Sequence, residues 1–405
     1  MAPARGGAVL AVLVGVMAVG PLFNYGVSAS SALVVDRLGI PDGLLGSVVS
    51  VVFVSAALTS LWLGRLADRL SVRTQLAIVF GGSALALVCA AFAQHYAVLL
   101  VAAALVGPTQ AIANPTTNRI ILAEAPPGRK TSWIGVKQSG VQASQLFAGL
   151  FFPAVALAFG WTGAALGAAL VAGVLWAVAV RVVGRTPGKV PDEEPAEGPK
   201  RGAERLPGAV WLTAAIAFLM GLGTQAANVY LALFAVRELD FPVVLAGAAV
   251  AVAGVVGVLS RIAWGRRMDA GDRPTTLLIM IGAGAIGSTV LLVVAAELHA
   301  GWLLWAAAAV HGMTALGTNV VLNAFLLFLV PRQRIGAASG VNSMGMFAGF
   351  SLGPIVMGAV LAATGHFTLG WWVMGGLYAA GIAVALVLRA RLGGVETERN
   401  AASAR

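Results

Sequence analysis

The strongest constraint on this 405-residue chain is that its two halves resemble each other. A shift of 201 positions lays the segment that starts at Asn24 over the segment that starts at Gln225, so that Pro41 meets Pro242. In the next stretch an offset of 205 pairs Gly107 with Gly312, Asn114 with Asn319, Asn118 with Asn323, Pro126 with Pro331, Gly135 with Gly340 and Gly140 with Gly345. An internal repeat of this length predicts two equivalent structural units, and it places a shared binding site where the units meet.

Composition indicates the environment of these two units. Hydrophobic residues make up 59% of the chain and charged residues 10%, with a mean hydropathy of +0.90, whereas soluble domains have roughly 45 to 50% and about 25%. A helix needs about 20 apolar residues to cross a hydrocarbon core of about 30 Å. Twelve stretches meet this requirement, near residues 8–34, 44–63, 74–93, 97–123, 131–159, 161–182, 208–235, 243–263, 276–296, 301–329, 335–363 and 369–388. The sequence therefore predicts an all-α polytopic membrane protein with twelve transmembrane helices in two pseudo-symmetric six-helix bundles.

The formal net charge of +10 follows the predicted topology. If the N-terminus lies inside, most of the 26 Lys and Arg residues fall in inner loops, and the outer ends hold only Arg37 and Arg237. Cationic loops resist translocation, so this asymmetry predicts that both termini are cytoplasmic and that the protein is multi-pass in the cytoplasmic membrane. A basic charge distributed in this way gives no support to a nucleic-acid partner.

One long polar segment divides the chain. Residues 184–207 carry Pro187, Pro191, Pro195, Pro199 and Pro207 among mixed charges, a composition that prevents a packed core. We expect an N-terminal six-helix bundle at 1–183, a cytoplasmic linker at 184–207, a C-terminal six-helix bundle at 208–390 and a cytoplasmic tail at 391–405.

A short motif follows the second predicted span. It reads Gly64-Arg65-Leu66-Ala67-Asp68-Arg69-Leu70-Ser71-Val72-Arg73, and the repeat returns part of it as Gly265-Arg266-Arg267-Met268-Asp269. With the duplicated halves and the long central loop, this motif resembles the signature of the major facilitator superfamily, and the resemblance covers essentially the whole chain. Ser71 and Val72 depart from the usual glycine and basic residue. The resemblance implies a secondary transporter with alternating access, without a cofactor or enzymatic activity, whose first, fourth, seventh and tenth helices line a central cavity.

The motif residues are candidates for a cytoplasmic latch. Gly64 lets backbones approach closely, and Asp68 at a helix junction can accept hydrogen bonds from exposed amides or from arginine. Glu124, at the inner end of its span, is placed to pair with a basic residue of the motif. The predicted latch comprises Gly64, Asp68, Arg69, Arg73, Glu124, Gly265 and Asp269. The alternative is a basic loop that only sets the topology.

Polar side chains inside the spans are candidates for substrate binding, because they are costly in hydrocarbon unless they face a cavity or each other. Residues three and four apart share a helix face, and by this rule amides and hydroxyls form stripes on five spans. The candidate substrate-binding residues are Asn24, Tyr25, Ser28, Gln110, Asn114, Lys137, Gln138, Gln142, Gln145, Gln225, Asn228, Asn319 and Asn323. For each stripe the alternative is hydrogen bonding between helices, worth about 0.6 kcal/mol per contact.

Lys137 is the most specific of these candidates. It lies about two turns inside its span, where a lysine costs roughly 2.5 to 3.5 kcal/mol, and the repeat places Asn342 at the equivalent position. Two interpretations stay open: Lys137 anchors a carboxylate or another anionic group, or its ammonium snorkels to the inner surface. Arg119 points away from the stripe that contains Gln110, which favours a structural or latch role.

Candidates for proton coupling are few. All sixteen Asp and Glu residues lie in loops, tails or helix ends, which disfavours the export of cationic drugs. His311 is the only histidine within a predicted span, and imidazole titrates near neutral pH. We take His311, Asp36 and Glu124 as coupling candidates. The sequence shows no His or Cys cluster with metal-ligand spacing and no paired groups typical of a catalytic site.

The expected function is secondary active transport, with a coupled proton, of a small polar or anionic organic solute such as a monocarboxylate. Export of neutral amphipathic compounds or drugs is the first alternative, because the predicted walls are rich in Phe, Met, Trp and Val. A sensor that binds substrate without transporting it is the second. The expected partners are the small-molecule substrate and the lipid bilayer, and we expect a monomer.

Overall fold

The computed structural model describes residues 3–126, 129–183, 206–331 and 334–403, and these residues form helices joined by short turns. The first half contains α1 (Pro3–Ala29), α2 (Ser31–Leu38), η1 (Asp42–Leu44), α3 (Leu45–Arg69), α4 (Val72–Leu76), η2 (Ala77–Gly81), α5 (Gly82–Ala91), α6 (Tyr96–Glu124) and α7 (Lys130–Val183). The second half contains α8 (Gly208–Glu238), α9 (Val243–Asp269), α10 (Pro274–Leu298), α11 (Trp302–Met313), η3 (Ala315–Gly317), α12 (Thr318–Leu329), α13 (Ile335–Thr364) and α14 (Phe367–Ser403). The prediction of an all-α membrane protein is confirmed.

Eleven segments of the described chain are long and apolar enough to cross a membrane. One of them, Trp133–Val183, is 51 residues long and therefore exceeds twice the length that a single crossing requires. Gly160 interrupts it with φ 68° and ψ 174°, so α7 is two helices that meet at a sharp turn. This turn lies between the two spans that the sequence predicts at 131–159 and 161–182.

The internal repeat is visible in the backbone. Gly160 and Gly365 are separated by the repeat offset, and both adopt positive φ, at 68° and 73°. Gly39 and Asp240 are another equivalent pair, with φ of 59° and 54°. A left-handed conformation costs an aspartate more than a glycine. The two halves therefore keep the same turn geometry even where the residue type has changed.

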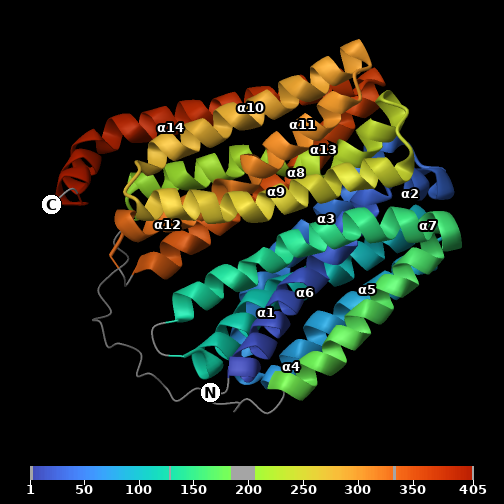
Figure 1. Cartoon of the computed structure of the whole chain (residues 1–405), viewed down its shortest axis with the longest axis horizontal. Helices are drawn as coiled ribbons and strands as arrows, with labels where there is room; N and C mark the ends of the chain where they lie inside the picture. Colours follow the sequence, from blue (N-terminus) through green and yellow to red (C-terminus); the bar gives the residue numbers. More distant parts are fainter. Residues whose placement is uncertain (1–2, 127–128, 184–205, 332–333, 404–405) are drawn as a thin grey trace.

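Figure 1 shows the helices as two groups lying side by side, with α1 to α7 in one group and α8 to α14 in the other. We call these groups the N-bundle and the C-bundle. Both chain termini lie at one end of the molecule (Figure 1), which we call the terminal end, and the opposite end is called distal. Residues such as Trp62 and Phe159, 70% and 75% exposed, give the outer surface the apolar character that a lipid environment requires.

Two equivalent helix pairs join the bundles. On one side, a Cβ placed on Gly46 of α3 would lie 2.2 Å from the carbonyl oxygen of Pro354 in α13. On the other side, a Cβ on Gly247 of α9 would lie 2.4 Å from the carbonyl oxygen of Gly149 in α7. Gly46 and Gly247 are repeat equivalents, as are Gly149 and Pro354. Backbone contact at both sites needs glycine, because any larger residue would overlap a main-chain atom.

Further contacts tie the bundles together from the distal end to about mid-length. The Tyr230 hydroxyl of α8 accepts a hydrogen bond from the Gly46 N–H at 3.0 Å and donates one to the Gly43 carbonyl at 3.0 Å. Phe53 of α3 packs on Phe347 and Phe350 of α13, with ring centroids 6.3 and 5.2 Å apart. The distal half of the interface is therefore closed by backbone, hydroxyl and aromatic contacts.

Four predicted helices differ from the structure. The span predicted at 8–34 ends at Ala29 and is followed by α2, and the span at 74–93 contains a π-helical turn over Ala77–Gly81. The span at 301–329 is broken at Thr314, where ψ is −76°, into α11, η3 and α12. The last helix continues to Ser403, well past the predicted end at 388 and into the segment expected as a polar tail. Apolar composition predicts where a chain crosses a membrane, but it does not reveal where side chains replace main-chain hydrogen bonds.

Candidate functional site

A buried network of amides connects the two bundles. Gln145 Nε2 donates to Asn228 Oδ1 at 3.4 Å, and Asn228 Nδ2 donates to Gln225 Oε1 at 3.3 Å. His311 Nε2 lies 3.2 Å from the same Asn228 oxygen. All four side chains are buried. The network therefore joins α7 of the N-bundle to α8 and α11 of the C-bundle, and it gives His311 a partner that sequence reasoning did not predict.

Lys137 lies inside the N-bundle. Its side chain is 1% exposed, and its ammonium donates to Asn114 Oδ1 at 3.3 Å, Thr117 Oγ1 at 2.9 Å and Asn118 Oδ1 at 2.6 Å. All three acceptors belong to α6 and are neutral. The snorkelling interpretation is therefore wrong, because the ammonium is held by a neighbouring helix rather than by the surface.

Arg261 is a site residue that the sequence analysis missed. Its Nε donates to the Leu316 carbonyl at 3.2 Å, and its Nη1 donates across the bundle interface to the Gln138 carbonyl of α7, also at 3.2 Å. The Tyr25 phenol lies within electrostatic range of the guanidinium. The span predicted at 243–263 places Arg261 at the inner end of its helix, whereas α9 extends to Asp269, two turns beyond Arg261. The repeat could have singled out Arg261, because the equivalent position in the first half is the uncharged Ser60 and the charge is therefore specific to one half.

Arg261 belongs to a row of three α9 side chains that bind the broken helix. Ser260 Oγ donates to the Gly312 carbonyl at 2.9 Å, and Trp264 Nε1 donates to the Met313 carbonyl at 2.7 Å. Carbonyls freed by a helix break must find donors, because lipid supplies none. Breaks of this kind in transporters line binding sites. The break between α11 and α12 and the Arg261 guanidinium therefore lie together at the bundle interface.

The other predicted substrate-binding residues are distributed over several environments. Asn24 and Tyr25 are buried on α1, and the Ser28 hydroxyl donates to its own helix at the Asn24 carbonyl. Gln110 is half-buried beside Gly20, where a Cβ would lie 2.7 Å from its Cγ. The half-buried Asn319 and the exposed Asn323 form no side-chain hydrogen bond with another described residue. The structure does not bring these last two into the amide network.

The coupling candidates lie far apart along the molecule. Asp36 forms an ion pair with Arg237 of the C-bundle at the distal end, and Arg237 also binds Asp42 at 3.1 Å. Glu124 is the buried last residue of α6, at the terminal end. Only His311 lies in the network between the bundles.

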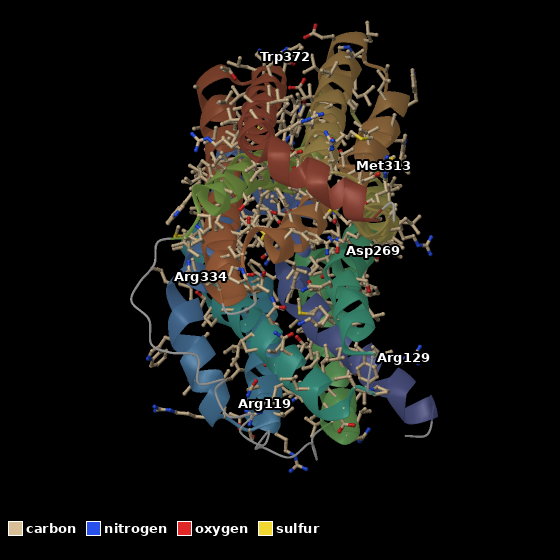
Figure 2. All side chains as sticks on the ribbon, turned by 90° about the vertical axis from the view of Figure 1, so that its left-hand side faces the viewer. Arg119, Arg129, Asp269, Met313, Arg334 and Trp372 are labelled. Carbon is tan, nitrogen blue, oxygen red and sulfur yellow. The ribbon has the colours of Figure 1, made fainter. Side chains whose placement is uncertain are left out.

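The predicted latch is described only in part. The side chains of positions 64 and 68 lie outside the described residues, and Arg69 and Asp269 are exposed. Figure 2 views the terminal end, with Arg119 and Arg129 on the N-bundle and Asp269 on the C-bundle. The Arg119 guanidinium donates to the Ala67 and Leu70 carbonyls at 3.1 and 2.7 Å. Arg119 thus caps the end of α3 within its own bundle, as a structural role requires.

Comparisons with known proteins agree on the fold. The sequence matches the Major Facilitator Superfamily over residues 9–306 and 261–404. A search of curated proteins finds no significant match. Among solved structures, a bacterial homolog of the human lysosomal transporter Spinster, in an inward-facing and occupied conformation, has 17% identity and a TM-score of 0.69, covering 100% of this chain and 98% of its own.

A mutant of the nucleoside transporter NupG has 14% identity and a TM-score of 0.74, covering 94% of this chain and 99% of its own. These identities support similarity of fold alone. The family match spans nearly the whole chain, and the protein therefore belongs to the Major Facilitator Superfamily of membrane transporters.

Proposed function

We propose that the protein is a secondary active transporter of a small anionic organic solute, with a monocarboxylate as the preferred class. The observation that carries the proposal is the pair of cations Lys137 and Arg261. Both lie in membrane-spanning segments, and among the described residues their hydrogen-bond partners are neutral oxygens only. A charge in hydrocarbon is expensive and typically marks a substrate pathway. An anion bound between the bundles would supply the missing negative charge.

The repeat supports a functional rather than a structural origin for both cations. The position equivalent to Lys137 is Asn342, and the position equivalent to Arg261 is Ser60. The pairing of α3 with α13 therefore uses the same helix geometry without either charge. Since the fold tolerates neutral residues there, we assign the two cations on the α7 and α9 side to recognition of the solute.

Alternating access gives the bundle contacts a role. We propose that the terminal end faces the cytoplasm and that the bundles rock about the amide network, with the distal contacts as the outer seal. The predicted latch at Gly64, Asp68 and their repeat equivalents would then close the inner side. Of the three coupling candidates, we favour His311, because it alone touches the buried amide network that joins the bundles.

Counterflow in proteoliposomes tests the proposal. We expect uptake of labelled monocarboxylates, and we expect Arg261→Gln and Lys137→Met to reduce it at least tenfold. Arg119→Gln is the matched control, because Arg119 is also a helical arginine bound to backbone carbonyls but contacts only its own bundle. Export of neutral amphipathic compounds that survives both substitutions would support the first alternative. Binding without counterflow would support a sensor.

A further inference from the structure

We propose that the solute carries hydroxyl groups beside its carboxylate, so that the substrate class is a hydroxylated monocarboxylate. This inference rests on the proposed function, since it places the hydroxyls next to the anion site. Its basis is a pair of glutamines on α7. Gln142 and Gln145 are both 1% exposed, and neither Oε1 atom has a hydrogen-bond partner among the described residues.

An unpartnered amide oxygen in a buried position is a costly feature. Most buried polar atoms in proteins are hydrogen-bonded, and leaving one without a partner costs about 1 to 3 kcal/mol. The structure orients the Gln145 amide with its nitrogen bound to Asn228, which is bound in turn to Gln225. The oxygen of Gln145 is therefore the atom left for a ligand. Its complement is a group that donates a hydrogen bond.

The position of the two oxygens relative to the cation fits one extended solute. Arg261 binds the carbonyl of Gln138, and Gln142 and Gln145 follow on the next turns of the same helix. With a rise of 1.5 Å per residue, they lie about 6 and 10 Å further along the α7 axis. A carboxylate at Arg261 would thus direct a short carbon chain past Gln142 and a longer chain on to Gln145.

The neighbouring helix holds the Gln142 side chain in place. A Cβ on Gly257 of α9 would lie 3.3 Å from Gln142 Cγ, and a Cβ on Gly254 would lie 3.3 Å from Gln145 Cβ. The absence of side chains at these two glycines lets the glutamines pack directly on the α9 backbone. A fixed amide discriminates better than a mobile one, because less rotational freedom is lost on binding.

Charge decides between the two common donors. An ammonium group would also satisfy an amide oxygen, but it would lie near Lys137 and Arg261, whose hydrogen-bond partners among the described residues are neutral oxygens that do not offset the repulsion. A hydroxyl donates without charge. The geometry therefore points to hydroxy acids and sugar acids rather than to amino acids.

This inference is tested by competition against the uptake of labelled monocarboxylates in proteoliposomes, with unlabelled competitors of matched length. Propionate, lactate and glycerate carry zero, one and two hydroxyls on three carbons, and hexanoate and gluconate extend the comparison to six. We expect affinity to rise with each hydroxyl, by up to about tenfold per hydrogen bond. Gln142→Met should reduce the ratio of glycerate to propionate affinity, and Gln145→Met should reduce the ratio of gluconate to hexanoate affinity.

Gln75→Met is the matched control. Gln75 is also buried with an unpartnered Oε1, but its amide nitrogen donates to the Ala67 and Leu70 carbonyls, at the end of α3 within the N-bundle. Gln75→Met should keep both wild-type ratios. Equal affinity for propionate and glycerate in the wild type would overturn the hydroxyl inference and leave anion transport standing. Failure of every anion to compete, with uptake of uncharged glycerol instead, would overturn the proposed function itself.

Discussion

Asp36 and Arg237 occupy the same position in the two repeats, and they form an ion pair with each other across the bundle interface. A residue near a pseudo-twofold axis meets its own counterpart. Two identical charged residues would repel at such a place, whereas a carboxylate facing a guanidinium attracts. The contact therefore depends on the divergence of the two halves after duplication.

The ion pair predicts a measurable effect on distal closure. Arg237→Ala removes contacts to Asp36 and Asp42 that join the bundles. Exposed ion pairs contribute about 0.2 to 1 kcal/mol, so we expect the ratio of closed to open protein to fall by up to about fivefold. Pulsed EPR distances between labels at His95 and His299, in a Cys89→Ser background, measure the ratio.

Arg37→Ala is the control for that experiment. Arg37 follows Asp36 in the chain, but its guanidinium binds the Thr162 hydroxyl and the Ala91 carbonyl within the N-bundle. An equal change in both variants would contradict a specific role for the cross-bundle pair. High salt should weaken the wild-type closure in the same direction, because it screens exposed charges.

The two equivalent glycines predict a stronger effect. Gly46→Val and Gly247→Val each place a side chain where a Cβ already overlaps a backbone oxygen. Backbone cannot yield as a flexible side chain does, so we expect each variant to separate the bundles and to lengthen the same EPR distance. Overpacking typically costs about 1 to 3 kcal/mol. Gly287→Val, at a site with nothing within 4 Å, should leave the distance unchanged.

The broken helix predicts a stability effect. Trp264→Phe keeps an aromatic ring but leaves the Met313 carbonyl without its donor. We expect a loss of about 1 to 3 kcal/mol in the free energy of unfolding. Urea denaturation of the purified protein measures this loss. Trp302→Phe, at a 70% exposed site, should have little effect, and an equal loss there would show that indole bulk, not the hydrogen bond, is responsible.

The contact of His311 with the amide network predicts that a substitution at His311 abolishes proton coupling without abolishing solute binding. His311→Gln retains a hydrogen-bonding group beside Asn228 but cannot take up a proton in the working pH range. We expect accumulation driven by a pH gradient to be lost while counterflow, which needs no proton movement, persists. Loss of both activities would assign His311 to solute binding or folding instead.

Much of the architecture could be predicted from the sequence, because it depends on features that sequence records. The repeat predicts two equivalent units, and the structure shows equivalent turns at Gly160 and Gly365. Apolar length predicts the spans. The polar stripes predicted Gln145, Gln225 and Asn228 as substrate-binding candidates on two different spans, and the structure joins all three in one hydrogen-bonded network.

The rest depends on distances between helices, which periodicity does not contain. Arg261 was missed because it lies two residues before the end of the span predicted at 243–263, where a charge only marks the membrane surface, whereas α9 continues to Asp269. The break at Thr314 was missed because the donors that permit it come from Ser260 and Trp264 of another helix. His311 appeared isolated for the same reason, since its partner lies 83 positions away in the chain.

The Tyr230 hydroxyl has a consequence for how this protein tolerates mutation. Both of its partners are main-chain atoms, at Gly43 and Gly46. Every residue type has a main-chain carbonyl, and every type except proline has a main-chain N–H, so most substitutions at Gly43 and Gly46 leave the groups that bind Tyr230 in place. A change of Tyr230 to phenylalanine, in contrast, deletes a single oxygen and abolishes both bonds at once.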